Sequence, residues 1–383
     1  MIKSAVILST GDITDSNTTY VAEGLVDLGI NVSAVVKVGG DKDKLLWALE
    51  QAGELGDLIV GTGGLEPMAN DLTVATIAAF LGVDFKHGQL PLGAAMIANP
   101  TGNTPGFQID IGQDKKIFWL PSAAPDLSAM LRLAVIPWIV QQMGGQSRLF
   151  EAIFKIYGLN ESRLKVLLEP IDLGGAGKLS CRSHYPDLTL RLTLDARVAD
   201  AAHFNALRMR IHALLGEFIY AEGDRAMEDV VGRLLMEKQQ TLALAESCTG
   251  GLIGHRITSV AGSSAYFLGG AITYSNKEKI RALGVKAATL DRFGAVSRET
   301  ALEMSRGIRE RTGASIALSV TGIAGPSGGG PEKPVGTVWL SLARTDRQEA
   351  RVLRLEAFGG REGIIQEASQ AALNWLRLSL LEL

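Results

Sequence analysis

Cysteine is scarce in this sequence, and its scarcity excludes several kinds of site. The 383 residues include two cysteines, Cys181 and Cys248, far apart in the chain, and five histidines, none at the HExxH spacing of a zinc motif. Neither a disulfide framework nor a cysteine- or histidine-based metal site is therefore expected. Low cysteine usage is typical of a reducing compartment, so we expect a cytoplasmic protein.

The sequence also lacks a long apolar run and a strong excess of charge. No apolar stretch approaches the roughly 20 residues of a membrane-spanning helix, and the early run in "MIKSAVILSTG" resembles a first strand more than a signal peptide. The formal net charge is −3, without the basic excess typical of nucleic-acid binding. We therefore expect neither a membrane nor a nucleic acid as a partner.

The overall composition and length are typical of a globular protein with more than one domain. Hydrophobic residues make up 46% of the sequence and charged residues 21%, and the length predicts two or three domains. Strand-like and helical patterns alternate over residues 1–147 and again over 225–383, which predicts parallel βαβ units. Residues 148–224 read as a small α+β module. We therefore predict the α/β class, with two three-layer α/β domains joined by this module. One stripe of the module's predicted helix consists of Ala202, Leu207 and Ile211.

The segment "LALAESCTGGLIGHRIT" (residues 242–258) places a carboxylate, hydroxyls and a thiol between a predicted strand and a predicted helix. Ligands of α/β proteins bind at the carboxyl ends of parallel strands, beside free N–H groups of the next helix. A hydroxyl there can act as a nucleophile when a base takes its proton. The alternative is that Ser247 or Thr249 caps the helix while Cys248 fills space. On these residues alone, both interpretations are equally well supported.

A second segment, "AITYSNKEKIRALGV" (residues 271–285), places Lys277 and Lys279 in the first turn of a predicted helix. Cations are disfavoured there because the N-terminal end of a helix carries partial positive charge. A desolvated lysine at such a position would have a lowered pKa and could act as a general base. Without a partner to activate, a solvated lysine that leans away from the helix is the simpler interpretation.

Two further segments have the composition of binding loops. "SVTGIAGPSGGGPEKPVGTVW" (residues 319–339) follows a strand with a loop rich in Gly and Pro, which could cradle a ribose or phosphate or form a flexible lid. "FGGREG" (residues 358–363) puts Arg361 at the start of the last predicted helix, where a guanidinium suits a phosphate.

These segments occur together, and in the same order, in the CinA family, whose C-terminal domain this sequence resembles. The matching segments are "AESCTGG", "TYSNKEK", "TGIAGPSGGGPEKPVGTVW" and the late Gly-Arg. Upstream, "IYGLNESRLK" also resembles the family pattern, so the resemblance covers nearly the whole chain. It implies similarity to nicotinamide-nucleotide amidases, which hydrolyse nicotinamide mononucleotide to the nicotinate nucleotide and ammonia.

The resemblance implies roles for residues of the C-terminal domain. Ser247 is expected to be the nucleophile and Lys279 its base, and no metal or other cofactor is implied for this reaction. Glu246 is expected to hold backbone or ribose groups, and Cys248 is the chemical rival to the serine. The expected partners are a small-molecule nucleotide substrate and a second copy of the chain in a homodimer. The residues expected near the substrate are Glu246, Thr249, Gly250, Gly251, Tyr274, Asn276, Thr321, Gly322, Gly325 and Arg361.

The N-terminal part resembles the molybdopterin-binding-like domain of the same family, with altered motifs. Where the family pattern reads Gly-Gly-Leu-Gly-Pro-Thr-x-Asp-Asp-x-Thr, this sequence has "GGLEPMANDLT", in which Glu66, Met68 and Asn70 depart from the pattern. Some members hydrolyse ADP-ribose here with a divalent metal, which requires carboxylate ligands. Asp71 is the one candidate ligand that is retained. We expect this activity to be lost or weak, with a divalent metal as cofactor only if the domain is active.

A function of a different class stays open beside the amidase. The chain could be a non-catalytic nucleotide-binding protein or a competence-associated scaffold. The intact serine, lysine and glycine-rich segments favour the enzyme, whereas the altered N-terminal motifs indicate that sites do decay in this chain.

Overall fold

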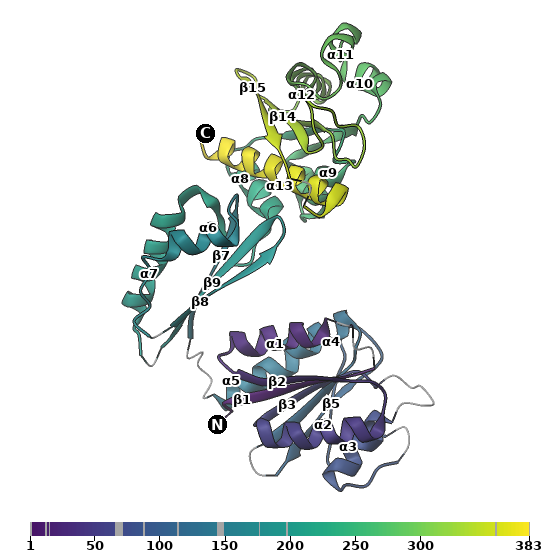
Figure 1. Ribbon diagram of the computed structural model, residues 1–383, viewed down its shortest axis with the longest axis vertical. Coiled ribbons are helices and arrows are strands. Elements are labelled where there is room, and N and C mark those ends of the chain that lie inside the picture. Colours follow the sequence, from purple (N-terminus) through teal and green to yellow (C-terminus); the bar gives the residue numbers. More distant parts are fainter. Residues whose placement is uncertain are drawn as a thin grey trace. The chain divides into compact units, whose positions relative to one another are not determined.

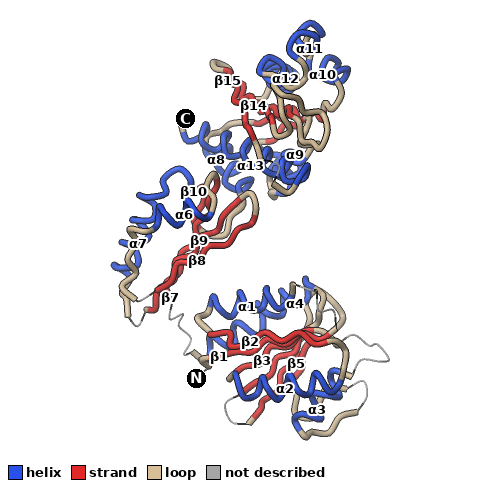
Figure 2. The backbone as a smooth tube through the Cα atoms, in the orientation of Figure 1, coloured by secondary structure: helices blue, strands red, loops and turns tan. Residues whose placement is uncertain are grey.

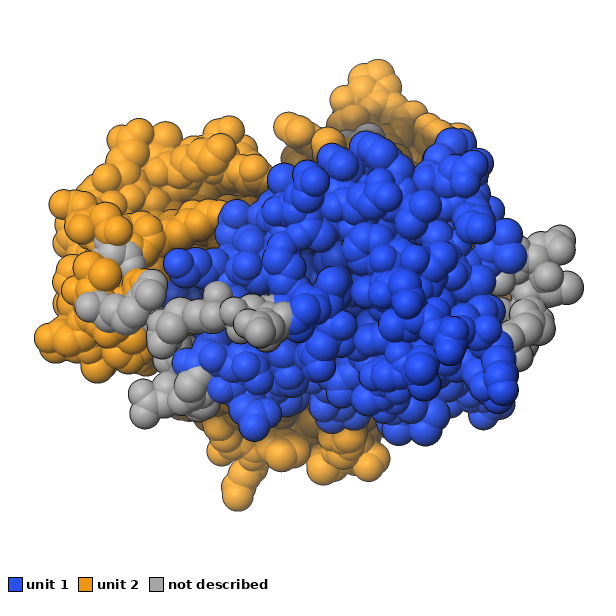
Figure 3. All heavy atoms as spheres, turned by 90° about the horizontal axis from the view of Figure 1, so that it is seen from below, with its two compact units in different colours: residues 1–149 blue, residues 150–383 orange. Residues whose placement is uncertain are grey.

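The structure, a computed structural model, describes residues 2–11, 14, 16–65, 72–86, 89–112, 115–143, 149–175, 177–196, 198–356 and 358–382. Contacts divide the chain into two compact units, residues 1–149 and 150–383, which are coloured separately in Figure 3. Among the described helices, none is both long enough and apolar enough to cross a membrane. The predicted domain end at residue 147 lies outside the described residues, as do Glu66, Met68, Asn70 and Asp71.

The first unit is built around a six-stranded sheet with helices on both faces (Figures 1 and 2). The strand order is β2 (Asn31–Val38), β1 (Ser4–Thr10), β3 (Leu58–Thr62), β6 (Lys115–Leu120), β5 (Gly106–Ile111) and β4 (Ala95–Ile97). β5 runs antiparallel to both of its neighbours. One face packs against α1 (Asn17–Asp27), α4 (Ala124–Met130), the π-helical turn Leu131–Val135 and α5 (Ile136–Gln142). The other packs against α2 (Lys42–Leu55) and α3 (Thr73–Leu81).

The side chains of β1 explain this layering. Ala5 and Ile7 pack into the core beneath α1, α4 and α5, whereas Val6 and Leu8 pack into the core beneath α2 and α3. Successive side chains of a strand point to opposite faces, so an unbroken apolar run fits a strand that is buried on both sides.

The second unit begins with a small module in which two helices cover one sheet. Its strand order is β10 (Ile219–Glu222), β7 (Leu149–Tyr157), β9 (Asp187–Asp195) and β8 (Gly177–His184). The core beneath α6 (Glu161–Leu168) and α7 (Ala201–Leu215) holds alternate residues of β9 and the buried stripe of α7. That stripe consists of Phe204, Leu207, Ile211 and Leu215. The predicted stripe was wrong at Ala202, which is exposed.

The rest of the second unit is a three-layer α/β domain. Its sheet has the order β12 (Phe267–Ile272), β11 (Leu242–Glu246), β13 (Ile316–Gly322), β14 (Thr337–Ala343) and β15 (Gln348–Arg354). β11, β12 and β13 are parallel, whereas β14 and β15 are antiparallel additions. The helices are α8 (Met227–Glu237), α9 (Leu252–Ser259), α10 (Asn276–Leu283), α11 (Ala287–Phe293), α12 (Arg298–Thr312) and α13 (Gly360–Leu381).

The central strand β11 separates two cores in this domain. Leu242 and Leu244 face the core that includes α8, α9 and α13, whereas the small side chains of Ala243 and Ala245 face α12. Both faces are therefore covered by helices, and the parallel strands deliver their carboxyl ends to one edge. The predicted fold class, α/β with three-layer domains and an α+β module, is confirmed.

Candidate active site

Ser247 lies at the carboxyl end of the central strand. β11 pairs in parallel with both β12 and β13, and the N–H of Ser247 donates to the carbonyl oxygen of Val320 on β13 at 3.0 Å. This bond extends the sheet by one residue beyond Glu246, so it fixes the serine backbone at the edge where α/β proteins bind ligands. Ser247 is also buried, with 7% of its surface exposed.

The amine of Lys279 reaches the hydroxyl of Ser247. Its Nζ atom lies 2.9 Å from Ser247 Oγ and 2.7 Å from the carbonyl oxygen of Thr273. Only 1% of Lys279 is exposed, and burial lowers the pKa of its amine to about 8. The interpretation as a solvated lysine is therefore wrong for Lys279, although Lys277 is indeed exposed.

The turn after β12 carries Lys279 to this position. The N–H of Thr273 donates to the carbonyl oxygen of Glu246 at 2.8 Å, which ties the end of β12 to the end of β11. The hydroxyl of Ser275 then caps α10 by accepting the N–H of Glu278. α10 thus begins at the sheet edge, and the lysine one turn later leans back toward it. The S-x-x-E spacing of Ser275 and Glu278 is a signal that could have located this helix start from the sequence.

Glu246 accepts hydrogen bonds from the free N–H groups at the N-terminus of α9. Its buried carboxylate accepts the N–H groups of Gly251, Ile253 and Gly254 and the hydroxyl of Thr249, at 2.7–3.2 Å. These N–H groups have no partner within the helix, and they lie at its positive end. A methyl group at Gly254 would lie 3.3 Å from Glu246 Oε1, so glycine leaves room for the carboxylate.

This arrangement corrects the prediction of how α9 is capped. The cap of α9 is the carboxylate of Glu246 and not the hydroxyl of Ser247 or Thr249. Glu246 and Thr249, both expected beside the substrate, are buried as Ser247 is and bonded to each other at 2.7 Å; their contact with a substrate stays a prediction. Glu246 was expected to bind either backbone groups or a ribose, and in the structure it binds backbone N–H groups. The two residues stabilise the loop of residues 247–251 that follows β11, here called the serine loop.

The same loop offers backbone donors beside the serine. In the part of the chain that the structure describes, the N–H groups of Cys248 and Thr249 donate to no backbone carbonyl. Gly250 and Gly251 have left-handed φ values of 62° and 101°, which turn the chain into α9. N–H groups next to a hydroxyl nucleophile can stabilise an oxyanion, provided that they face the reacting carbon.

The side chain of Cys248 is packed in the apolar core beside the site. Its side chain belongs to the apolar cluster that contains Leu244 and Ile253, and burial raises the pKa of its thiol to about 12. The thiol therefore stays protonated near neutral pH, and a protonated thiol is a poor nucleophile. Of the two candidate nucleophiles, the geometry favours Ser247.

Arg361 joins two predicted site residues from separate segments. Its guanidinium donates to the carbonyl oxygen of Gly325 at 2.8 Å and to the hydroxyl of Tyr274 at 3.0 Å. Tyr274 is 64% exposed, and the neighbouring Asn276, the first residue of α10, is exposed as well. The start of α13, the loop after β13 and the turn after β12 therefore meet at the surface of the domain.

Thr321 and Gly322 serve packing within the sheet. The hydroxyl of the buried Thr321 donates to the carbonyl oxygen of Ala295 at 2.9 Å. A Cβ at Gly322 would lie 2.7 Å from the side chain of Val338 on β14. These contacts give both residues a packing role, and their contact with a substrate stays a prediction.

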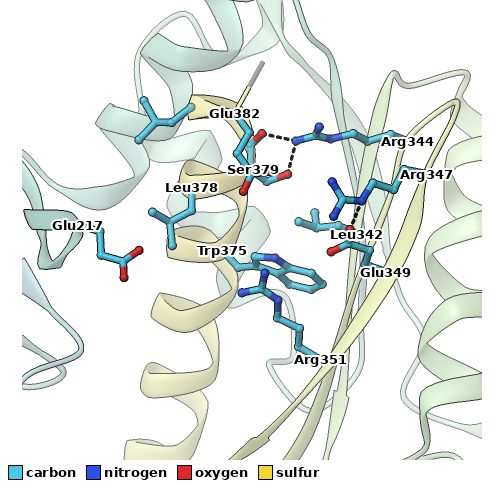
Figure 4. A pocket seen from close by; sticks show the side chains of 11 residues that line it. Glu217, Leu342, Arg344, Arg347, Glu349, Arg351, Trp375, Leu378, Ser379 and Glu382 are labelled. Carbon is cyan, nitrogen blue, oxygen red and sulfur yellow. Dashed lines mark hydrogen bonds and ion pairs between the residues drawn. The ribbon is translucent and has the colours of Figure 1, made fainter.

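A cavity of about 340 Å³ lies between β14, β15 and the last turns of α13, away from these residues (Figure 4). Arg344 donates to the carbonyl and hydroxyl oxygens of Ser379, and the guanidinium of Arg351 lies 4.7 Å from the ring centre of Trp375. Arginines that bind the last carbonyls of a helix stabilise its negative end. Arg344 and Arg351 thus hold α13, whereas Arg347 and Glu349 of the same cavity pair with each other.

The fold and the site together define an α/β protein with a buried serine–lysine pair at the carboxyl end of a central parallel strand. Residues 224–380 match the family described as "CinA C-terminal domain", and residues 4–141 match the one described as "Probable molybdopterin binding domain". The chain belongs to the CinA family, as its sequence motifs predicted.

Known relatives span nearly the full length of this chain. The CinA-like proteins of Geotalea daltonii and Citrifermentans bemidjiense are 35% and 37% identical, cover 98% of this chain, and are themselves covered to 99% and 95%. The crystal structure of competence/damage inducible protein CihA from Agrobacterium tumefaciens is 40% identical, with a TM-score of 0.39, and the match covers 41% of this chain and 97% of that one.

Proposed function

We propose that the C-terminal domain is an amidase that hydrolyses nicotinamide mononucleotide to nicotinate mononucleotide and ammonia. The observation that carries this proposal is the 2.9 Å contact between the amine of Lys279 and the hydroxyl of Ser247. A hydroxyl needs a base to become a nucleophile, and a lysine whose pKa is lowered to about 8 supplies one near neutral pH. The choice of substrate rests on the family resemblance.

The first half of the reaction forms an acyl-enzyme. The lone pair of neutral Lys279 takes the proton of Ser247, and Oγ attacks the carboxamide carbon of the substrate. Negative charge then develops on the carboxamide oxygen, where the N–H groups of the loop after Ser247 can stabilise it. As the C–N bond breaks, the lysine returns the proton to the departing nitrogen, and ammonia leaves.

The second half of the reaction hydrolyses the ester. Lys279, now neutral again, takes a proton from a water molecule, and the resulting hydroxide attacks the acyl carbon. The ester bond breaks, Ser247 recovers its proton from the lysine, and the nicotinic acid group loses its proton to solvent and leaves as the carboxylate. Cys248 has no part in these steps, because its thiol is buried and protonated.

Arg361 is the residue we assign to the phosphate of the nucleotide. Its guanidinium is exposed and is already oriented by Tyr274 and the carbonyl of Gly325. A planar guanidinium can bind two phosphate oxygens at once. This assignment predicts that the phosphate contributes to binding and leaves the serine chemistry to the opposite end of the substrate.

Release of ammonia from nicotinamide mononucleotide by the full chain tests the proposal. Ser247→Ala should lower the rate by about 10³-fold or more, because the bond-forming atom is removed. Cys248→Ser is the matched control, and it should keep the rate within a few-fold of wild type. If Cys248→Ser removes the activity and Ser247→Ala does not, the assignment of the nucleophile is wrong.

The same preparations separate the enzyme from the alternative, a non-catalytic nucleotide-binding protein or competence-associated scaffold. A chain that binds the nucleotide in calorimetry but releases no ammonia would support the binding protein. The buried contact between Ser247 and Lys279 favours the enzyme. A site that only binds a nucleotide does not need a desolvated amine, which is costly to bury.

A further inference from the structure

One face of α13 carries a row of contacts to the small module. Glu367 accepts the hydroxyl of Tyr157 at 2.9 Å, and Gln370 donates to the carboxylate of Asp187 at 2.6 Å. Further along, Arg377 donates to the carbonyl oxygen of Glu217 at 2.8 Å. These residues of α13 follow one another at intervals of three and seven, which places them on one stripe of the helix. The module is therefore attached along the length of α13.

The stripe extends to the first turn of α13, where Tyr185 makes the contact. Tyr185 lies at the tip of the β8–β9 hairpin, and its ring packs on Phe358 with 5.3 Å between ring centres. Its ring edge also lies 3.7 Å from the position that a Cβ would take at Gly363. Tyr185 therefore packs on the residue two positions before α13 and lies beside the first turn of the helix, on both sides of Arg361 in the sequence.

The backbone next to Arg361 needs such support. Gly359 and Gly360 both adopt left-handed φ values, 74° and 64°, and glycine gives a chain more conformational freedom than any other residue. Tyr185 and Phe358 border a cavity of about 470 Å³ instead of a closed core. Truncation of the Tyr185 ring would thus leave the start of α13 with open space on this side.

A second connection leads from the module toward the serine loop. Gln370, which donates to Asp187, accepts in turn from the guanidinium of Arg256 at 2.5 Å. Arg256 belongs to α9, the helix whose start is held by Glu246. Both helices that border the site are therefore linked to the same hairpin of the module.

We infer that the module is a positioning element of the amidase site, and that Tyr185 holds Arg361 in place for the phosphate of the substrate. This inference rests on the proposed function. Tyr185 does not contact the reacting atoms, so it acts on substrate binding and leaves the chemical step unchanged. The module thus contributes to affinity for phosphorylated substrates.

Steady-state kinetics of the full chain test this role. Tyr185→Ala should raise KM for nicotinamide mononucleotide about 2- to 10-fold, the range expected for loss of one aromatic pair, with kcat within 2-fold. Tyr185→Phe keeps the ring and loses only the hydroxyl that bonds Glu367, so its KM should stay within 2-fold of wild type. Met209→Ala, on an exposed residue of the same module, is the matched control and should change neither constant.

Nicotinamide riboside, which lacks the phosphate, supplies the decisive comparison. Tyr185→Ala should leave KM for the riboside unchanged, and it should add no further loss in an Arg361→Ala background. An equal rise in KM for both substrates, or a fall in kcat alone, would overturn the inference.

We call the packing of Tyr185 against Phe358 and the first turn of α13 the clamp. Hydrogen exchange of residues 358–365 tests this clamp without any assay of activity. Tyr185→Ala should accelerate exchange there, and Tyr185→Phe should not. If wild type releases no ammonia, the proposed function fails, while faster exchange in Tyr185→Ala still supports the clamp. Unchanged exchange in Tyr185→Ala would reject the clamp whatever the activity.

Discussion

Lys279 is an amine that the fold has removed from water, and this sets the pH range in which it can work. Its pKa is lowered to about 8 by burial, and only the neutral form can accept the proton of Ser247. We expect kcat/KM for nicotinamide mononucleotide to rise about tenfold per pH unit below pH 8 and to level off above it. Ammonia release measured from pH 6 to 10 gives the profile.

The exposed neighbour Lys277 provides the control for this profile. Lys277→Ala should leave both the plateau and the midpoint unchanged, because its side chain is exposed. A profile that is flat between pH 6 and 9 would contradict the role of Lys279 as the base.

Replacing the lysine should separate activity from stability. Lys279→Met removes the base and should lower kcat/KM by about 10²–10⁴-fold. It also removes the desolvation cost of a buried amine while filling a similar volume, so the midpoint of urea unfolding should stay the same or rise. A variant that loses both activity and stability would indicate that the amine is needed for folding, which the buried contact to Ser247 alone does not predict.

For single residues, the sequence revealed which residue types were available but not where each side chain would point. The pattern around Lys279 favoured a solvated lysine, because a first-turn position is unfavourable for a cation. Its burial follows from the tie between Thr273 and Glu246, a contact between two strands. The pairing of the lysine with Ser247 could be predicted only from the family resemblance.

Glu246 connects the end of a strand to the start of a helix, and its loss should loosen both. Glu246→Gln places an amide N–H₂ group against backbone N–H groups that now meet a carboxylate. We expect the free energy of unfolding to fall by about 1–3 kcal/mol, the range for hydrogen bonds to a charged group. Activity should fall as well, because Ser247 lies between β11 and α9. Urea unfolding and ammonia release measure the two effects.

Glu278→Gln is the matched control for this variant. Glu278 is an exposed carboxylate on α10 that pairs with Arg281 on the surface. Exposed pairs of this kind contribute little, so its unfolding curve should match that of wild type. Equal destabilisation by the two variants would mean that the cap of α9 has no special importance.

Most elements could be predicted from the sequence, since apolar runs and helical periodicity mark them directly. The role of Thr321 could have been predicted as well. Ser319, two residues earlier on β13, donates to the carbonyl of Ala301 on α12, and side chains two apart on a strand share a face. Thr321 therefore lies on the α12 face of β13, and its hydrogen bond to Ala295 follows from that placement.

Contacts between distant segments could not be predicted in this way. The bonds that attach the module to α13 join residues separated by 160 to 210 positions. Each partner is an ordinary polar or charged residue in its own segment, and no local pattern marks it. Long-range pairings of this kind depend on the whole fold, which is why the sequence indicated a linking module without its relation to the site.

The proposed amidase reaction should not depend on a metal. Within the described residues, no group of three or more His, Cys, Asp and Glu side chains is placed to hold a metal ion, and the proposed steps use only Ser247, Lys279 and backbone donors. Dialysis against a chelator should therefore leave kcat and KM for nicotinamide mononucleotide unchanged. A loss of activity that added divalent metal restores would contradict the proposed mechanism.

The N-terminal domain should show little or no metal-dependent cleavage of ADP-ribose. Its altered motif has Asn70 where the family pattern has a carboxylate, and a hard cation needs such oxygen ligands. We expect the full chain to form no AMP from ADP-ribose with Mg²⁺ or Mn²⁺, measured in a Ser247→Ala background that removes the proposed amidase activity. The combined change Glu66→Gly, Met68→Thr and Asn70→Asp restores the family pattern and should raise AMP formation. Substantial cleavage by the unaltered motif would show that Asp71 and the remaining residues suffice, and the domain would then be a second active site.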